Sequence, residues 1–413
     1  MTPKTVVVGA GLAGLTCALR LAEAGHRVAV VAAGAGSLHL GGGTIDVLGY
    51  APERVESPAS ALDGFVGSHP DHPYARVQEG LFEESIEWLK GHAAPLRFGG
   101  SMDENLLLPT AVGAPKPSAL APHSLASGDL RRGGRFLLVS PKALKDFYPG
   151  LAAANLCSID GIEARALELP GTVQGEADPG PLRLARAFDD PLFRADIAAR
   201  LKDRIEPGER VGWPAVLGLN RGPEAVCELA ERLEAPVFEI ATLPPSVPGM
   251  RLYELLSRAL KKAGGRIVLG PRVAAGEAKG KVLRAVSALT GARRSEHEAR
   301  NFVLASGGVA AGGVTLDSSW RFEESVIGLP VAGVPPPGSE RFSPDVFGPH
   351  PAGRVGVAVD DKWRPLDASG GVVYDNVYVC GATLAGADPQ REKSGNGISL
   401  VTGYAVADAI LRL

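Results

Sequence analysis

Three glycines near the start of the chain have the spacing of a phosphate-binding turn. Gly9, Gly11 and Gly14 form a GxGxxG pattern that follows an apolar run, residues 4–8, and opens a second apolar run, residues 12–24, with helical periodicity. The first glycine of such a pattern permits a tight turn, the second lets a phosphate approach the backbone, and the third lets the helix pack close to the sheet. The pattern therefore predicts a strand, a turn and a helix whose N-terminus binds a nucleotide phosphate.

The carboxylate that usually accompanies this motif is missing. An acidic residue near the end of the second strand normally binds the ribose hydroxyls of an adenosine. Here the second strand, residues 27–31, is followed by Ala32 and Ala33, and no acidic residue occurs between Glu23 and Asp46. Either other groups bind the adenosine, or the nucleotide has no adenosine.

Two further strand-and-glycine segments are expected to meet the same nucleotide. The apolar run at 302–304 ends in Ser306 and Gly307, and the run at 376–380 leads through a glycine-rich loop into a helix at 398–411. A glycine-lined helix N-terminus can direct N–H groups at the pyrimidine end of an isoalloxazine ring, which indicates a flavin. The predicted flavin-binding residues are Gly9, Gly11, Gly14, Gly42, Gly43, Thr44, Ser306, Gly307, Gly381, Gly395 and Gly397.

Length and composition indicate a globular protein with two domains. The chain has 413 residues, more than one hydrophobic core usually serves, and its net charge of −3 gives no sign of a nucleic-acid-binding protein. We predict an α/β fold, with a discontinuous Rossmann-type flavin-binding domain and a second, inserted α/β domain. The flavin-binding domain is expected at residues 1–50, 251–315 and 375–413, the inserted α/β or cap domain at 51–250, and an irregular cap-associated segment at 316–374.

Other local patterns add elements within these domains. Residues 82–90 and 223–233 predict helices, 135–140 predicts a strand, and 141–147 predicts a further helix. Two prolines and a glycine in residues 242–252 predict a rigid loop. The four cysteines form no CxxC pair and the histidines show no metal-ligand spacing, so we expect no metal and no iron–sulfur centre.

Six stretches together resemble one family. They are SLHLGGGTIDVLG at 37–49, HPY at 72–74, TLPPSVPGMRL at 242–252, ASGGVAAGG at 305–313, GVAVDDKWRP at 356–365 and VYVCGATLAGADP at 377–389. Spread over the whole chain, they are similar to the B subunits of anaerobic glycerol-3-phosphate dehydrogenases. This family belongs to a wider group of two-domain flavoproteins that includes fumarate reductases. In one departure, Arg391 to Ser394 stand where a more continuous glycine run is expected.

The resemblance implies an activity, a cofactor and partners. The complex oxidises sn-glycerol 3-phosphate to dihydroxyacetone phosphate and passes electrons to quinone, and FMN is the cofactor associated with the B subunit, with FAD as the alternative. The implied partners are the catalytic, flavin-bearing A subunit of the complex and a membrane-anchoring iron–sulfur subunit. The chain would then be cytoplasmic and held peripherally at the inner face of the cell membrane.

Substrate chemistry within this chain would need a cation for the phosphate and a base for the hydroxyl proton. Arg251 is the candidate phosphate ligand, and His39 or His72 is the candidate base; each could equally be a structural residue. Two other functions stay open. One is a non-catalytic flavin electron-relay subunit. The other is a free-standing fumarate-reductase-like oxidoreductase, for which the sequence supplies no evident set of arginines and histidines around a dicarboxylate.

Overall fold

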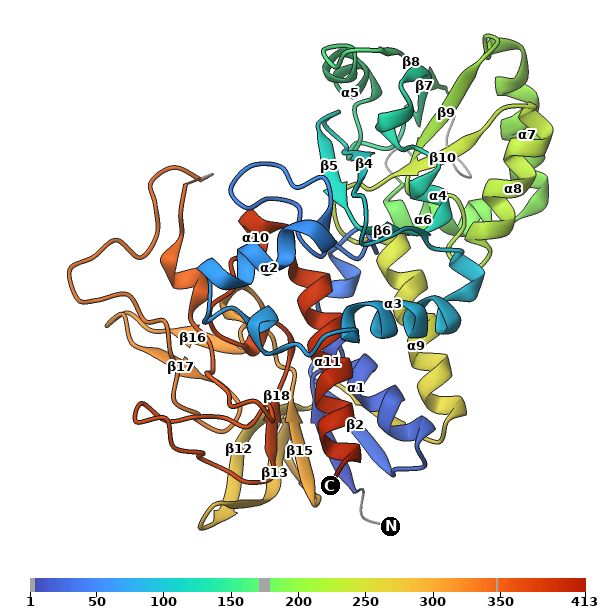
Figure 1. The fold of residues 1–413 in the computed structure, drawn as a ribbon. Coiled ribbons are helices and arrows are strands. Elements are labelled where there is room, and N and C mark those ends of the chain that lie inside the picture. The colour runs from blue at the N-terminus through green and yellow to red at the C-terminus, as the bar shows by residue number, and fades with distance from the viewer. Residues whose placement is uncertain (1–3, 171–178, 347) are drawn as a thin grey trace. The chain divides into compact units, whose positions relative to one another are not determined.

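The chain divides into two compact units, each built from segments far apart in the sequence. The computed structural model describes residues 4–170, 179–346 and 348–413. Unit 1 consists of Met1–Ser37, Ala61–His92 and Leu255–Leu413, and unit 2 of Leu38–Ser60 and Ala93–Glu254 (Figure 1). This division differs from the predicted boundaries, because residues 38–50 lie in unit 2 and residues 61–92 lie in unit 1.

Unit 1 contains a five-stranded parallel sheet in the order β11-β2-β1-β15-β18. Its strands are β1 (Thr5–Val8), β2 (Val28–Ala32), β11 (Arg266–Leu269), β15 (Asn301–Leu304) and β18 (Val377–Val379). Because β1 and β2 are buried on both faces, they are continuous apolar runs. Helix α1 (Leu12–Glu23) connects β1 to β2, so the βαβ unit and the Rossmann-type fold are confirmed.

Three helices pack together in unit 1. Helix α11 (Gly395–Leu411) lies beside α1, and α3 (Leu81–His92) lies beside α11 (Figure 1). A Cβ atom at Gly403 would lie 2.5 Å from the carbonyl oxygen of Ala13, so only glycine allows α11 to approach α1 this closely. Helix α11 begins three residues before the predicted residue 398, and it follows the short helix α10 (Pro389–Glu392).

The remaining elements of unit 1 are smaller. An antiparallel sheet contains β12 (Arg272–Lys279), β13 (Val282–Thr290) and β14 (Arg293–Glu298), and a hairpin contains β16 (Val314–Leu316) and β17 (Phe322–Glu324). Helix α2 (Pro58–Ser68) leads into the unit from unit 2. From Ser325 to Asn376 the described chain is mostly irregular, which agrees with its high content of proline and glycine.

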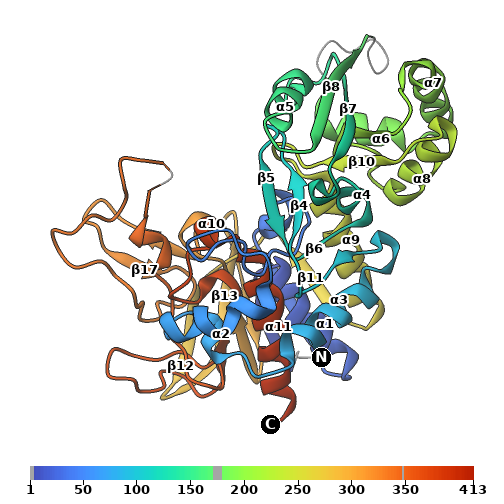
Figure 2. The same cartoon turned by 45° about the horizontal axis from the view of Figure 1, so that its top comes forward.

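Unit 2 has its own four-stranded parallel sheet, in the order β10-β9-β7-β8. The strands are β7 (Gly134–Pro141), β8 (Ile162–Leu169), β9 (Glu209–Pro214) and β10 (Val237–Ile240). Figures 1 and 2 show α5 (Pro149–Leu156) on one face of this sheet and α7 (Pro191–Leu201) and α8 (Gly222–Leu233) on the other. The other elements are β3 (Gly99–Gly100), β4 (Leu106–Pro109), β5 (Pro115–Ser118), β6 (Leu120–Ala121), α4 (His123–Ala126), α6 (Pro181–Phe188) and α9 (Val247–Lys262).

Two sequence predictions in unit 2 are wrong, and prolines explain both. Residues 142–148 form turns rather than a helix, and the helix begins instead at Pro149, where the missing N–H costs no hydrogen bond. Within the segment predicted as a rigid loop, residues 242–252, helix α9 already begins at Val247. Pro248 is tolerated there because the first turn of a helix needs no backbone donor.

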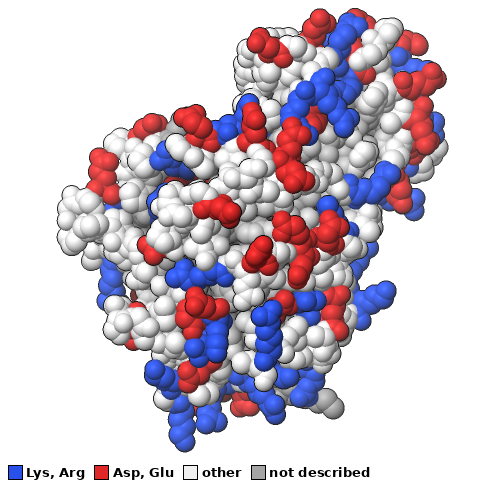
Figure 3. All heavy atoms as spheres, in the orientation of Figure 1, with Lys and Arg blue, Asp and Glu red and all other residues white. Residues whose placement is uncertain are grey.

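Charge is mixed over the visible surface of both units, with acidic and basic side chains interspersed (Figure 3). Within the described parts of the chain, no helix combines the length and the hydropathy that a membrane span requires.

Candidate functional site

The three glycine motifs predicted from the sequence meet at one edge of the unit 1 sheet. The Ala305 N–H donates to the Val8 carbonyl at 2.8 Å, and the Cys380 N–H donates to the Leu304 carbonyl at 3.0 Å. The turns after β1, β15 and β18 therefore leave the sheet side by side. The chain order reverses between β1 and β15, and the carboxyl end of such a switch point is where α/β sheets bind nucleotides.

Gly9 and Gly14 are required by contacts within the protein. A Cβ atom at Gly9, whose φ is +112°, would lie 2.1 Å from the Ala305 carbonyl oxygen. One at Gly14 would lie 2.1 Å from the Gly9 carbonyl oxygen. Gly9 thus permits the turn and Gly14 permits the close approach of α1, which are the roles that the spacing predicts.

Gly11 faces open space. A Cβ atom there would meet none of the described atoms within 4 Å, although its neighbours Gly9 and Gly14 are tightly packed. Gly11 is the N-cap of α1, and no described side chain caps this end of the helix. The first N–H groups of the helix have no intrahelical acceptor, so they can bind an anion. An open position over uncapped N–H groups fits the phosphate of a flavin nucleotide.

The second and third motifs are joined by a threonine that the sequence analysis did not single out. The Thr383 hydroxyl accepts the Gly307 N–H at 3.0 Å and lies 3.4 Å from the Ser306 hydroxyl. Thr383 is fully buried, in the turn that follows Gly381. A Cβ atom at Gly381 would lie 2.7 Å from the Ala13 Cβ, so this turn also reaches the start of α1.

Gly395 and Gly397 lie in the first turn of α11, and His72 reaches the residues just before that turn. The His72 Nε2 is 3.2 Å from the Glu392 Oε2, and its Nδ1 accepts the Tyr74 N–H at 3.1 Å. His72 is buried, and both of its ring nitrogens are engaged. The prediction that His72 acts as a base is therefore not supported, because accepting a substrate proton would require breaking one of these bonds.

The end of β2 carries no acidic side chain, as the sequence shows. Gly36, which follows shortly after, has a φ of +69°, and a Cβ atom there would lie 2.7 Å from the Gly11 Cα. The turn after β2 thus lies directly against the phosphate-binding turn. In an adenosine-binding protein, a carboxylate at the end of this strand binds the ribose hydroxyls, and this chain has no carboxylate there.

In unit 2, the two most distinctive sequence motifs pack against each other. A Cβ atom at Gly249 would lie 1.7 Å from the Leu38 carbonyl oxygen, and one at Gly43 would lie 2.9 Å from the Pro248 carbonyl carbon. His39 takes part in this contact, because its carbonyl accepts the Ser246 N–H at 2.8 Å. The GGG loop at 41–43 and the PSVPG segment at 245–249 are therefore one structural feature.

Two polar side chains of this loop are bound by residues of β5. The Lys116 Nζ donates to the Asp46 Oδ2 at 2.6 Å and to the Thr44 hydroxyl at 3.0 Å, and the Ser118 hydroxyl donates to the Asp46 Oδ1 at 2.6 Å. Thr44 is buried. Lys116 was not predicted from the sequence, because it lies about 70 residues from its partners in a short proline-rich strand.

His39 retains the properties of a possible base. Its ring packs edge-on against Tyr253, with centroids 4.8 Å apart, and burial lowers the pKa of the imidazole below its usual value. A lowered pKa keeps the ring neutral near pH 7, which is the form that accepts a proton.

Arg251 is held inside unit 2. Its Nη1 and Nη2 donate to the two carboxylate oxygens of Glu239 at 2.6 and 3.0 Å, its Nε donates to the Gly218 carbonyl at 2.8 Å, and its Nη2 also donates to the Leu217 carbonyl at 3.0 Å. Both charged side chains are buried. The prediction that Arg251 binds a phosphate is not supported, since a phosphate would have to displace Glu239.

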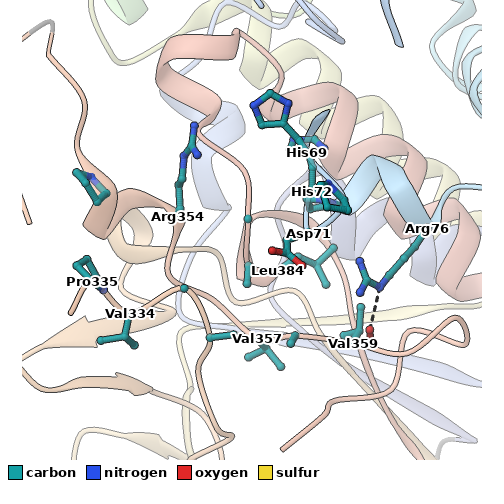
Figure 4. A pocket seen from close by; sticks show the side chains of 18 of the residues that line it. His69, Asp71, His72, Arg76, Val334, Pro335, Arg354, Val357, Val359 and Leu384 are labelled. Carbon is teal, nitrogen blue, oxygen red and sulfur yellow. Dashed lines mark hydrogen bonds between the residues drawn. The ribbon is translucent and has the colours of Figure 1, made fainter. Parts of the chain in front are cut away.

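Unit 1 contains a cavity of about 780 Å³ that borders the turn after β18. Its wall includes Leu384 and Gly386, and Figure 4 shows Val334, Val357 and Val359 as apolar surface along one side, with His69, Asp71, Arg76 and Arg354 around it. The Arg76 Nε donates to the Val359 carbonyl at 2.9 Å. A largely apolar cavity with a few charged groups suits a small organic ligand.

The chain is similar in sequence to known proteins along almost its whole length. A family model described as FAD binding domain matches residues 4–398. The B subunit of a probable anaerobic glycerol-3-phosphate dehydrogenase of Halobacterium salinarum is 34% identical over 423 residues, which cover 98% of this chain and 97% of the relative. The B subunit of the anaerobic glycerol-3-phosphate dehydrogenase of Pectobacterium carotovorum is 34% identical over 431 residues, which cover 100% and 99%.

Likeness to solved structures is weaker. The 3-ketosteroid Δ1-dehydrogenase of Sterolibacterium denitrificans covers 100% of this chain and 99% of its own, at 11% identity and a TM-score of 0.45. Sequence likeness, rather than structural likeness, therefore relates this chain to proteins of named activity.

Proposed function

Because the chain belongs to the FAD binding domain family and to the family of anaerobic glycerol-3-phosphate dehydrogenase B subunits, we propose that it is the flavin subunit of such a dehydrogenase. The reaction is the oxidation of sn-glycerol 3-phosphate to dihydroxyacetone phosphate. The observation that carries this proposal is the 34% identity over nearly the full length of both chains. The convergence of the three glycine motifs on one sheet edge supports it independently, because it provides a flavin-binding site.

Each candidate element, in unit 1 or in unit 2, has a task in the proposed reaction. A bound flavin supplies a hydride acceptor, N5, for the hydrogen on C2 of the alcohol. The uncapped N-terminus of α1 would hold the flavin phosphate, and the N–H groups of the first turn of α11 would stabilise negative charge on the pyrimidine end of the reduced ring. His39, neutral because burial lowers its pKa, is the candidate to accept the hydroxyl proton. The cavity at the turn after β18 is the candidate location of the substrate.

We expect the bound nucleotide to be FMN. The phosphate-binding turn is present, but neither Ala32 nor Ala33 can bind adenosine ribose hydroxyls. Denaturing the purified protein and separating the supernatant by reversed-phase chromatography identifies the nucleotide released. FAD is the alternative, which the family match favours. One equivalent of FAD per chain would refute the FMN assignment and show that groups other than a carboxylate at the end of β2 bind the adenosine.

We propose that the chain works with two partners: the catalytic flavin-bearing A subunit, and an iron–sulfur subunit that holds the complex at the inner face of the membrane. The relatives are named as subunits, and the four cysteines lack the spacing of an iron–sulfur site. Electrons that reach this flavin therefore need an acceptor outside the chain, and quinone is the final acceptor that we propose.

The isolated chain is accordingly expected to show little or no glycerol 3-phosphate:quinone turnover, and co-expression with the two partners should restore it. The assay compares the lone chain with the complex, using a quinone analogue and, separately, an artificial dye. Dye reduction by the lone chain at the rate of the complex would show a self-sufficient dehydrogenase. In the same complex, unchanged turnover of His39→Gln would remove His39 as the base.

A non-catalytic electron-relay subunit is the second candidate function. It is favoured by the engagement of His72 and Arg251, two of the three predicted catalytic residues, in hydrogen bonds within the protein. Reduction of the flavin by glycerol 3-phosphate in the isolated chain distinguishes the two functions: a catalytic subunit is reduced directly, and a relay is reduced only when the catalytic partner is present.

A further inference from the structure

A buried hydrogen-bonded chain links the HPY segment to the start of α11. The Glu392 Oε2 lies 3.2 Å from the His72 Nε2 and accepts the Ser394 hydroxyl at 2.7 Å, while its Oε1 accepts the Asp388 N–H at 2.8 Å. His72, Glu392 and Ser394 are 1%, 6% and 0% exposed. All of these residues lie in unit 1. Burying this many polar groups is costly unless all of them are paired. The flavin and substrate roles assigned above give no reason for this buried group.

The hydrogen bonds of His72 fix which of its two ring nitrogens carries the proton. Because the His72 Nδ1 accepts the Tyr74 N–H, the ring proton is on Nε2 and is donated to Glu392. Burial raises the pKa of Glu392, but the hydrogen bonds from His72, Ser394 and the Asp388 amide outweigh it and hold the pKa below its usual value. The carboxylate is therefore charged at neutral pH and accepts the hydrogen bonds of His72 and Ser394.

The series of buried hydrogen bonds ends at Ser394, the residue just before α11. Ser394 is the N-cap of α11, its hydroxyl is used by Glu392, and its carbonyl accepts the Tyr74 hydroxyl at 3.3 Å. The next residues include Gly395 and Gly397, and glycine has more backbone freedom to lose than any other residue. A first turn of this composition needs contacts from outside the helix to hold one conformation.

We propose that His72 is a positioning residue that holds the first turn of α11, through Glu392 and Ser394, in the orientation that binds the pyrimidine end of the flavin. The proposal rests on the proposed flavin contacts of Gly395 and Gly397. It gives the HPY segment a role in flavin binding, although His72 itself does not touch the reacting atoms. A purely structural role would instead confine His72 to capping the turn at 73–76, through its bond to the Tyr74 N–H.

Two substitutions at this one position separate these roles. His72→Asn places an amide oxygen near the former Nδ1, so it keeps the cap on Tyr74 and loses Glu392. His72→Gln places an amide N–H near the former Nε2, so it keeps the donor to Glu392 and loses the cap. Both variants are compared with His297→Asn, a change at a histidine of β14 whose Nε2 lies 3.2 Å from the Ser295 hydroxyl. Glu392→Gln removes the charge at the other end of the same bond.

Titration of each apoprotein with FMN and with FAD measures flavin affinity, and the flavin reduction potential is measured on the loaded protein. We expect His72→Asn and Glu392→Gln to bind the flavin about tenfold more weakly, because a first turn of α11 without this buried hydrogen bond must be ordered on binding; tenfold corresponds to about 1.4 kcal/mol. Their reduction potential should fall, because a loosened helix N-terminus stabilises the anionic reduced flavin less. His72→Gln and His297→Asn should match the unmodified protein in both measurements.

Three outcomes would overturn the proposal. In the first, every variant has the affinity and potential of the unmodified protein. In the second, His72→Gln is impaired as much as His72→Asn, which would assign the effect to the cap on Tyr74. In the third, Glu392→Gln is unaffected, and this variant carries the test if His72→Asn does not fold. No measurement here uses glycerol 3-phosphate. Flavin affinity and reduction potential therefore test this proposal even if the proposed dehydrogenase activity is not found.

Discussion

Gly11→Val should yield a folded protein without flavin. Its Cβ would meet none of the described atoms within 4 Å, so the substitution introduces no clash within the chain. The branched side chain would instead occupy the space over the uncapped α1 N-terminus, where the phosphate is proposed to bind. We expect the purified variant to lack the yellow absorbance of bound flavin while keeping the circular dichroism spectrum of the apoprotein.

Two other glycines control this experiment. Gly14→Val places its Cβ 2.1 Å from the Gly9 carbonyl oxygen, so it should disrupt packing and lower the yield of folded protein. Gly64 in α2 also has open space at its Cβ position, and Gly64→Val should retain both the fold and the flavin. Full flavin occupancy in Gly11→Val would show that this turn does not bind the phosphate.

Arg251→Met should strongly destabilise unit 2. The substitution removes the guanidinium donors of both carboxylate oxygens of Glu239, a fully buried side chain that keeps the hydrogen bond from the Leu217 N–H. Removing one member of a buried ion pair costs about 3–5 kcal/mol, because the remaining charge is uncompensated. Unfolding in urea, followed by tryptophan fluorescence in a variant that keeps Trp213 in the core of unit 2 and has phenylalanine at the other three tryptophans, measures the loss.

The double variant Arg251→Met and Glu239→Met tests the cause. Replacing both partners with apolar groups of similar size removes the uncompensated charge, so much of the lost stability should return. A double variant as unstable as the single one would mean that the bonds from Arg251 to Leu217 and Gly218 carry the effect. Loss of substrate affinity in the double variant without loss of stability would restore Arg251 as a phosphate ligand.

The parts of the fold that the sequence predicts well are those whose cause is local. The runs at 4–8 and 12–24 and the glycines between them contain the information for β1, the turn and α1, since the contacts of Gly9 and Gly14 follow from their spacing. Residues 82–90 likewise predict a helix, and both ends of α3, Leu81–His92, lie within two residues of that range. The periodicity of α3 shows that one of its faces is buried, but it does not show that this face packs on α11. The sequence therefore predicts residues 61–92 in the inserted domain, whereas they lie in unit 1.

The parts that the sequence does not predict depend on distant pairs. His72 and Glu392 are 320 residues apart, and a histidine beside prolines looks the same whether it is a base or a donor to a buried carboxylate. Arg251 lies in a distinctive motif and is predicted to bind a ligand, but it is paired with Glu239. Glu239 lies in the apolar strand β10, and an acidic residue in such a strand is the one sign in the sequence that it needs a buried cation. Candidate site residues can thus be located from sequence more readily than their hydrogen-bond partners.

The order of strands in unit 1 has a consequence for synthesis of the chain. Strand β1 emerges from the ribosome first, but its neighbour β15 follows only at Asn301–Leu304, and β18 only at Val377–Val379. The sheet of unit 2 is complete once Ile240 has been made. Unit 2 can therefore fold during translation, whereas the N-terminal segment must wait for nearly the whole polypeptide. The three turns proposed to bind the flavin are accordingly present together only after Val379 has been made.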